Sequence, residues 1–131
     1  MHRDPHPGNI IGAGGEIAGF IDFDLAEVNA RLFDPVYCPT AFLSKIRGDR
    51  APWLGLLAEI MRGYDRAARL TGAKKRAVFW VIYSVQLIFI AYFDAPEHAR
   101  LAQSNAETLR WVWARRREIE NLANSCKKEI L

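Results

Sequence analysis

The sequence is poor in cysteine and shows no signal for export. Its 131 residues include only two cysteines, Cys38 and Cys126, which lie far apart without the spacing of metal ligands. This argues against a disulfide framework and predicts reduced thiols in a cytoplasmic protein. No charged and then apolar segment opens the chain, so we do not expect secretion.

The sequence also lacks a strong charge of either sign. The formal net charge is only +3, and most of it comes from short basic runs at 74–76, 115–117 and 127–128. Basic runs at helix ends usually solvate a surface or complement the helix dipole. No aromatic–basic groove or known reader motif accompanies them, so we expect no nucleic-acid partner.

No apolar run reaches the length that a membrane-spanning helix needs. The longest stretch without a charge covers residues 77–93, which is seventeen positions with Ser84 and Gln86 near the centre, whereas a spanning helix needs about twenty. A helix that is apolar on all sides is also typical of the centre of a small domain. We therefore favour a core helix and no membrane partner, with a membrane helix as the alternative.

The first part of the chain predicts a loop followed by a β-hairpin. Residues 2–9 contain two prolines and one glycine, which oppose regular structure. The β-prone runs 9–11 and 17–21 are joined by a glycine-rich connection at 12–15 that can reverse the chain. Such a hairpin would bring Asn9 back alongside Asp22.

The remainder predicts helices, which gives a mainly α fold with one small β-hairpin. Asp34 and Pro35 are typical of a helix start, as N-cap and first-turn residue. Apolar periodicity then predicts helices over 36–46, 53–70, 77–93 and 104–124. The last would bury one stripe, made of Leu109, Val112, Trp113, Ile119 and Leu122.

The opening motif combines the residue types of a phosphoryl-transfer site. His2-Arg3-Asp4 is followed after four residues by Asn9, and Asp22 comes thirteen positions beyond Asn9. The same spacing occurs in the catalytic loop of kinases. A carboxylate base, an amide and a second carboxylate suit a reaction in which the protein positions groups and holds magnesium.

With Ile21-Asp22-Phe23-Asp24 and Asp34-Pro35, this motif resembles the C-terminal lobe of the aminoglycoside phosphotransferase and choline kinase-like family, which are small-molecule kinases distantly related to protein kinases. The motif-bearing resemblance covers about residues 2–40. Arg3 stands where the family usually has glycine, as in the protein-kinase form of the motif. The Pro7-Gly8-Asn9 ending and the short step to Ile21-Asp22 favour the small-molecule branch. Asp24 stands where protein kinases have the glycine of Asp-Phe-Gly.

The resemblance implies an ATP-dependent phosphotransferase that acts on a small-molecule hydroxyl, with Mg²⁺ and ATP as cofactors. Asp4 would be the catalytic carboxylate, and Asn9 and Asp22 would bind the metal and the nucleotide. Asp24 would be either a further metal ligand or a turn cap. The structural alternative for Asp4 and Asn9 is a turn-forming role.

Four further residues would shape this site. We expect His2 and His6 to brace the loop by hydrogen bonds, and Asp34 to cap its helix and help hold the loop. Arg3 has three open partners, namely Asp24, Glu27 or a substrate anion.

The resemblance also implies N-lobe elements that have no counterpart in residues 1–131. A kinase of this type covers the phosphates with a glycine-rich turn and neutralises them with a strand lysine, but all five lysines follow the catalytic loop. We expect a single partial domain over 1–131 without an N-lobe, in which 1–34 form the catalytic loop and metal-binding hairpin and 35–131 a helical C-lobe.

An alternative is a non-catalytic remnant that acts as a binding module. The uncovered hairpin face predicts self-association or an N-lobe partner through Ile10, Ile11, Phe20 and Phe23.

Overall fold

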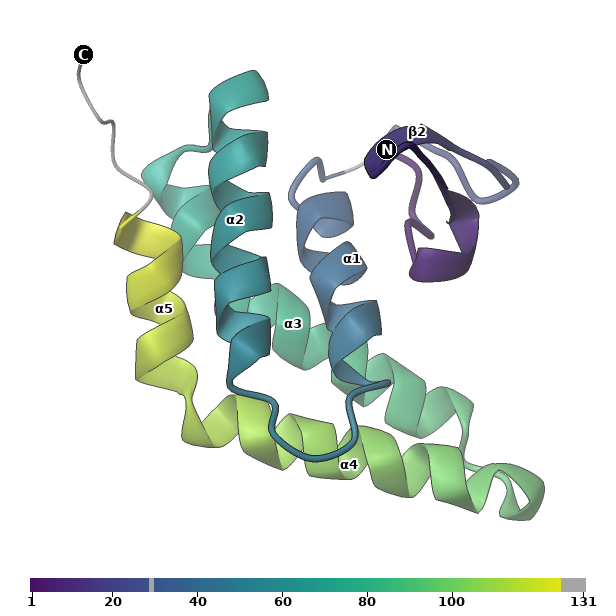
Figure 1. The fold of residues 1–131 in the computed structure, drawn as a ribbon. Coiled ribbons are helices and arrows are strands. Elements are labelled where there is room, and N and C mark those ends of the chain that lie inside the picture. Colours follow the sequence, from purple (N-terminus) through teal and green to yellow (C-terminus); the bar gives the residue numbers. More distant parts are fainter. Residues whose placement is uncertain (29, 126–131) are drawn as a thin grey trace.

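The computed structural model describes residues 1–28 and 30–125. They form a bundle of helices with one two-stranded sheet beside it (Figure 1), as the sequence predicts. In chain order the elements are η1 (Pro7–Asn9), β1 (Ile10–Ala13), β2 (Glu16–Phe20), α1 (Phe33–Leu43), α2 (Pro52–Ala67), α3 (Gly72–Tyr92), η2 (Pro96–His98), α4 (Ala99–Ala114) and α5 (Arg116–Ser125). Cys126 lies outside the described residues, and Cys38 is a half-buried free thiol.

The hairpin forms where the glycine-rich connection predicts it. Gly14 and Gly15 have φ angles of 60° and 85°, and the tight turns that match the twist of a hairpin need positive φ at both central residues. A bulge separates the Ile11–Gly19 and Gly12–Ile17 pairs. The ladder extends beyond the strands, because the Ile21 N–H donates to the Asn9 carbonyl at 3.0 Å.

Helix boundaries differ from the predicted ones by several residues at some ends. Helix α1 begins at Phe33 and ends at Leu43, and its N-cap residue is Leu32 without a side-chain cap bond. The expectation that Asp34 is the N-cap is therefore wrong. Helix α3 begins five residues earlier than 77, because the Thr71 hydroxyl caps it by accepting the Lys74 N–H.

The last predicted helix is two helices. The chain leaves helical geometry at Arg115, with φ −106° and ψ 17°, between α4 and α5. Figure 1 shows α5 turning away from the line of α4, so that it packs against α2 and α3. Val112 and Ile119 still reach the core, but Trp113 is 50% exposed, so its predicted place in the buried stripe is wrong.

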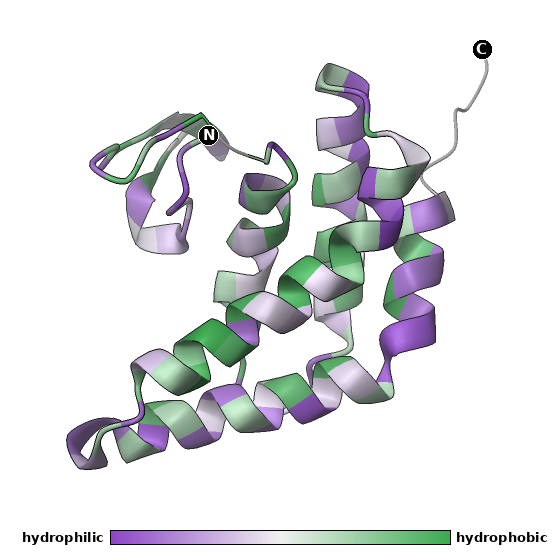
Figure 2. Cartoon of the chain, turned by 180° about the vertical axis from the view of Figure 1, so that it is seen from behind, coloured by the Kyte–Doolittle hydropathy of each residue, from purple (hydrophilic) through white to green (hydrophobic). Residues whose placement is uncertain are grey.

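Helix α3 is central to the bundle and packs against α1, α4 and α5. It buries Val78, Phe79, Ile82, Val85 and Gln86, but Trp80, Leu87, Ile88 and Tyr92 are exposed. Figure 2, seen from behind, shows that hydrophobic residues occur along most of this helix. It is thus a core helix on one side only, which corrects the expectation of burial all round. By length and composition alone, it is the one helix in the described part of the chain that could cross a membrane.

An ion pair ties the end of α2 to the start of α3. The Asp65 carboxylate accepts from Lys75 Nζ at 2.7 Å and from the Leu70 N–H at 2.7 Å. Burial alone would raise the pKa of Asp65, but the Lys75 and Leu70 hydrogen bonds and the positive charges of Lys75 and Arg69 outweigh it and lower that pKa. The folded state therefore holds the charged carboxylate more strongly than the unfolded state does.

This pair predicts a pH-dependent contribution to stability. The stabilisation is present above the unfolded-state pKa of about 3.9 and is lost as the pH falls through the lower folded-state pKa. We expect Asp65→Asn to cost about 1–3 kcal/mol at pH 7 in urea unfolding, with the difference from wild type shrinking in acid. Glu59→Gln is the matched control, because Glu59 pairs with Arg62 at the exposed surface of α2. Equal effects of both substitutions at pH 7 would contradict the prediction.

Candidate functional site

Helix α1 holds the opening loop through Asp34. One oxygen of its carboxylate accepts the N–H of His2 at 2.7 Å and the other accepts the N–H of Arg3 at 2.8 Å. Because both oxygens are engaged by the loop backbone, the side chain does not cap its own helix. Arg3 has a φ of 71°, and this turn of the backbone presents two successive N–H groups to one carboxylate. Asp34 thus holds the loop, as the sequence predicts.

His2 braces the loop against the hairpin. Its buried ring lies 4.5 Å from the ring of Phe23. Nε2 is 2.9 Å from the Ile21 carbonyl oxygen, and Nδ1 accepts the N–H of Asp4 at 3.3 Å. This pattern requires the proton on Nε2, since Nδ1 is an acceptor. The bracing role expected for His2 agrees with these contacts.

The Asp4 carboxylate is fixed from two sides. Oδ1 accepts from the Tyr37 hydroxyl at 3.0 Å, and Oδ2 accepts from Asn9 Nδ2 at 3.3 Å. The same amide nitrogen donates to the Asp4 carbonyl at 3.0 Å. His6 Nε2 lies 3.6 Å from Oδ2, and the Asp4 side chain is 24% exposed. The carboxylate is therefore oriented and still accessible from outside, which suits a group that accepts a proton from a bound hydroxyl.

Tyr37 is the residue of this cluster that the sequence did not reveal. Burial, the hydrogen bond to Asp4 and the negative charge of Asp4 raise the pKa of its phenol far above the ordinary value. The hydroxyl thus remains a neutral donor in the ordinary pH range. The available clue is its position three residues after Asp34, because residues three apart share one face of a helix.

Asn9 and Asp22 lie at the same end of the hairpin. Asn9 is buried, with 6% of the residue exposed, and its Nδ2 donates both of its bonds to Asp4, so that Oδ1 is the side-chain atom that could accept from or coordinate another group. The backbone bond between Ile21 and Asn9 brings Asp22 to the next position, where it is exposed with a φ of 63°. The predicted juxtaposition of Asn9 and Asp22 is thus present in the backbone ladder.

Asp24 lies in the turn after Asp22 and takes part in none of the hydrogen bonds described above. The Ala26 N–H closes this turn on the Phe23 carbonyl at 2.8 Å, so the turn is held by backbone groups. Within residues 1–28 and 30–125, no three His, Cys, Asp or Glu side chains form a group that could hold a metal ion. Magnesium, however, is typically bound by one or two carboxylates together with waters and substrate phosphates.

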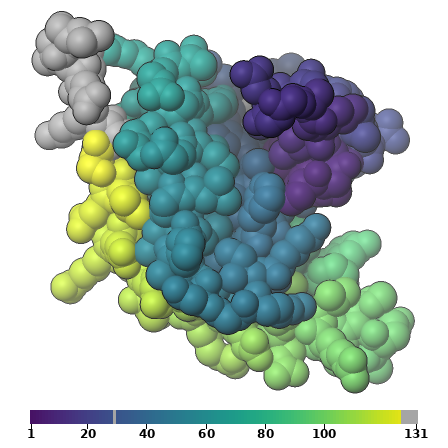
Figure 3. Space-filling view, viewed as in Figure 1, coloured from purple at the N-terminus to yellow at the C-terminus, as the bar shows by residue number. Residues whose placement is uncertain are grey.

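The remaining loop residues have identifiable partners. Arg3 forms an ion pair with Glu27, at 3.2 Å between Nη1 and Oε1, so of the two carboxylates expected as partners it contacts Glu27; a substrate anion stays a prediction. His6 accepts the Gly8 N–H at Nδ1 and so caps η1. Residues 7–9 thus form a short helical turn, although the prolines in residues 2–9 led us to expect no regular structure there. Figure 3 shows the loop and hairpin in purple at one corner of the molecule.

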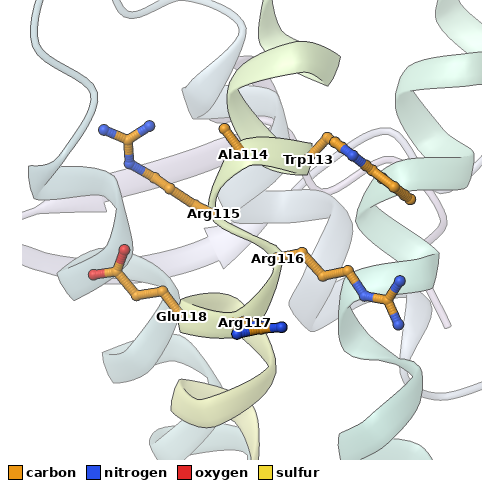
Figure 4. A pocket seen from close by; sticks show the side chains of 6 residues that line it. All are labelled: Trp113, Ala114, Arg115, Arg116, Arg117 and Glu118. Atoms are coloured by element: carbon orange, nitrogen blue, oxygen red, sulfur yellow. The ribbon is translucent and has the colours of Figure 1, made fainter.

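Asp4 lines neither of two surface hollows in the described part of the chain. One is lined by residues 113–118 at the junction of α4 and α5. Figure 4 shows Trp113 and Arg116 on one side of it and Arg115 and Glu118 on the other. Arg116 lies over the Trp80 ring at 4.8 Å and pairs with Glu120, while Arg115 lies over the Trp111 ring. The basic run is thus largely occupied with local packing.

Comparison with known proteins identifies the region that contains the loop and hairpin. The model of the phosphotransferase enzyme family matches residues 1–76, which include Asp4, Asn9, Asp22 and all of α1 and α2. No curated protein and no solved structure matches the chain. The family match therefore covers more than half of the sequence, including every residue of the candidate site.

Proposed function

Because this chain belongs to the phosphotransferase enzyme family, we propose that it transfers the γ-phosphoryl group of ATP to the hydroxyl group of a small molecule. The observation that carries the proposal is the Asp4 carboxylate, which is held between Tyr37 and Asn9 and remains accessible. In phosphoryl transfer the protein acts mainly by positioning and by electrostatics, and this arrangement supplies positioning.

The donor atoms of the site fit a hard cation. Asn9 Oδ1 and the Asp22 carboxylate are oxygen ligands of the kind that Mg²⁺ prefers, and the backbone bond between Ile21 and Asn9, which brings the two residues to one end of the hairpin, supports this assignment. These two residues would hold the ion, with Asp24 as a further candidate. An ion held there would supply positive charge to offset the negative charge of the nucleotide phosphates.

Asp4 would act on the acceptor hydroxyl. Its carboxylate would orient the hydroxyl and take its proton as the acceptor oxygen bonds to the γ-phosphorus. The bond from that phosphorus to the bridging oxygen breaks at the same time, and ADP leaves with the electron pair. Tyr37 and Asn9 each donate one hydrogen bond to the Asp4 carboxylate, and each carboxylate oxygen keeps a further lone pair for the acceptor.

Magnesium-dependent nucleotide binding tests the proposal. We expect calorimetry of the full chain to show ATP binding only with Mg²⁺, and Asp22→Asn to weaken it at least tenfold, about 1.4 kcal/mol. Asp94→Asn is the matched control, because Asp94 is an exposed aspartate after α3, outside the loop and hairpin. Asp24→Asn then tests the third ligand, since a loss of the same size would assign Asp24 to the metal.

The opposite result would favour the second candidate function. A folded chain that binds no ATP in the presence of Mg²⁺ would fit a non-catalytic interaction module. The observation that favours this candidate is the exposure of Ile11, Phe20 and Phe23 in and beside the hairpin, since exposed apolar surface often marks an interaction site. Ile10, also expected to be exposed, is half-buried.

A further inference from the structure

Helix α1 presents two side chains to the loop from one face. Asp34 fixes the backbone of His2 and Arg3, and Tyr37, three residues later, donates to Asp4 Oδ1 at 3.0 Å. One helix thus contacts three successive loop residues. The hydrogen bonds of Asp34 go to the loop backbone and set its path, whereas Tyr37 bonds the Asp4 side chain. Only a bond to the carboxylate itself can set the rotation of that group.

We propose that Tyr37 is a positioning residue for Asp4, whose phenol fixes the plane of the carboxylate for reaction with the acceptor hydroxyl. The inference rests on the function proposed above and adds a residue to it. Asn9 holds Oδ2 at 3.3 Å, and Tyr37 holds Oδ1 at the shorter distance of 3.0 Å. With donors on both oxygens the carboxylate has one orientation, whereas a single donor would leave it free to rotate.

Tyr37 is itself rigidly placed, as a positioning group must be. Its ring stacks on Phe33 with centroids 5.3 Å apart and planes at 18°. Phe89 of α3 contacts it from the bundle, at 6.1 Å between centroids. The phenol is therefore held by α1 and α3 together, and its raised pKa keeps it protonated as a donor. The packing of α1 and α3 around the Tyr37 ring therefore helps to set the orientation of the Asp4 carboxylate.

Tyr37→Phe isolates the hydroxyl, because phenylalanine keeps the ring that stacks on Phe33. Tyr83→Phe is the matched control, since Tyr83 is also a half-buried tyrosine, stacked on Phe79 of the same helix α3 at 5.9 Å. The acceptor is unidentified, so the probe is Mg·ATP, with water taking the place of the acceptor. Circular dichroism of each variant checks that the fold is retained.

Two readouts separate positioning from a structural role. In protein labelled with ¹³C at the aspartate carboxyl carbons, the Asp4 resonance, assigned by its loss in Asp4→Asn, should shift and broaden in Tyr37→Phe and not in Tyr83→Phe. In ATP turnover, Tyr37→Phe should lower kcat about ten- to hundredfold with KM for ATP unchanged, since small misplacements of reacting groups have effects of this size.

Each outcome decides one claim. An Asp4 resonance that is the same in wild type and Tyr37→Phe would overturn the inference, as would an unchanged kcat or a change in KM alone. A changed Asp4 resonance in a protein whose wild type turns over no ATP would support the orientation of Asp4 by Tyr37 and count against the proposed function. Failure of the two proposals is thus distinguishable.

Discussion

Asp4→Asn is expected to lower the turnover of Mg·ATP by a factor of about 10²–10⁴, the usual range for loss of a general base. The substitution keeps the size of the side chain and leaves an oxygen that can accept from Tyr37. An amide cannot, however, take a proton from the attacking hydroxyl. Release of ADP measured in a coupled assay gives kcat. Calorimetry should show ATP affinity close to that of wild type, because Asp22 is unchanged and Asn9 keeps its bond to the backbone carbonyl of residue 4.

Asp49→Asn provides the control for this prediction. Asp49 is also a loop aspartate, and its carboxylate accepts the N–H of Ala51 at 2.9 Å in the connection between α1 and α2. Its replacement should leave turnover unchanged. Turnover by Asp4→Asn within a few-fold of wild type would remove the catalytic role of Asp4 and leave only its part in holding Asn9.

The parts of the site that were predictable depend on short-range sequence patterns. Asp4 and Asn9 are five residues apart, and a glycine turn is enough to return the chain from Asn9 to Asp22. Gly14 and Gly15 supply the positive φ angles that this turn needs, so local chemistry determines the hairpin. The placement of these three residues therefore followed from the sequence, whereas their roles in catalysis and metal binding remain proposals.

The parts that were not predictable depend on contacts between distant residues. Asp34 has the preference of a helix cap, yet the N–H groups of His2 and Arg3, more than thirty residues earlier in the chain, bind its carboxylate in the folded state. The Tyr37–Asp4 bond spans a similar separation, and no periodic pattern marks it. Local preference cannot decide between partners that only the tertiary fold brings together.

The division of the last helix has the same kind of cause. Val112 and Ile119 are seven positions apart, a spacing that suits both a straight helix and the observed pair of helices. The bend at Arg115 is supported by tertiary contacts, because α5 packs against α2 as well as α3. Its consequence for Trp113, which lies half exposed beside Arg116, could not be derived from periodicity.

Trp53→Ala is expected to cause the largest loss of stability, about 3–5 kcal/mol in urea unfolding. Trp53 is 1% exposed and meets Trp111 of α4 edge to face at 5.9 Å between centroids. Its Nε1 donates to the Pro39 carbonyl of α1 at 2.6 Å, so the substitution leaves a cavity and removes the hydrogen bond that joins α2 to α1. Trp53→Phe keeps much of the ring and should cost only about 1–3 kcal/mol for the lost bond.

Trp113→Ala is the matched control, because this tryptophan is half exposed and should cost about 1 kcal/mol. A Trp53→Ala variant no less stable than Trp113→Ala would show that the contact between α1 and α2 contributes little.

The expected loss also bears on the site, since Pro39 belongs to the same helix as Asp34 and Tyr37. Trp53 fixes α1 against α2, and α1 in turn holds the loop that carries Asp4. Because a loss of about 3–5 kcal/mol is a large part of a typical stability of about 5–15 kcal/mol, Trp53→Ala should also weaken ATP binding at temperatures where the wild type is folded, although Trp53 lies far from the loop in sequence.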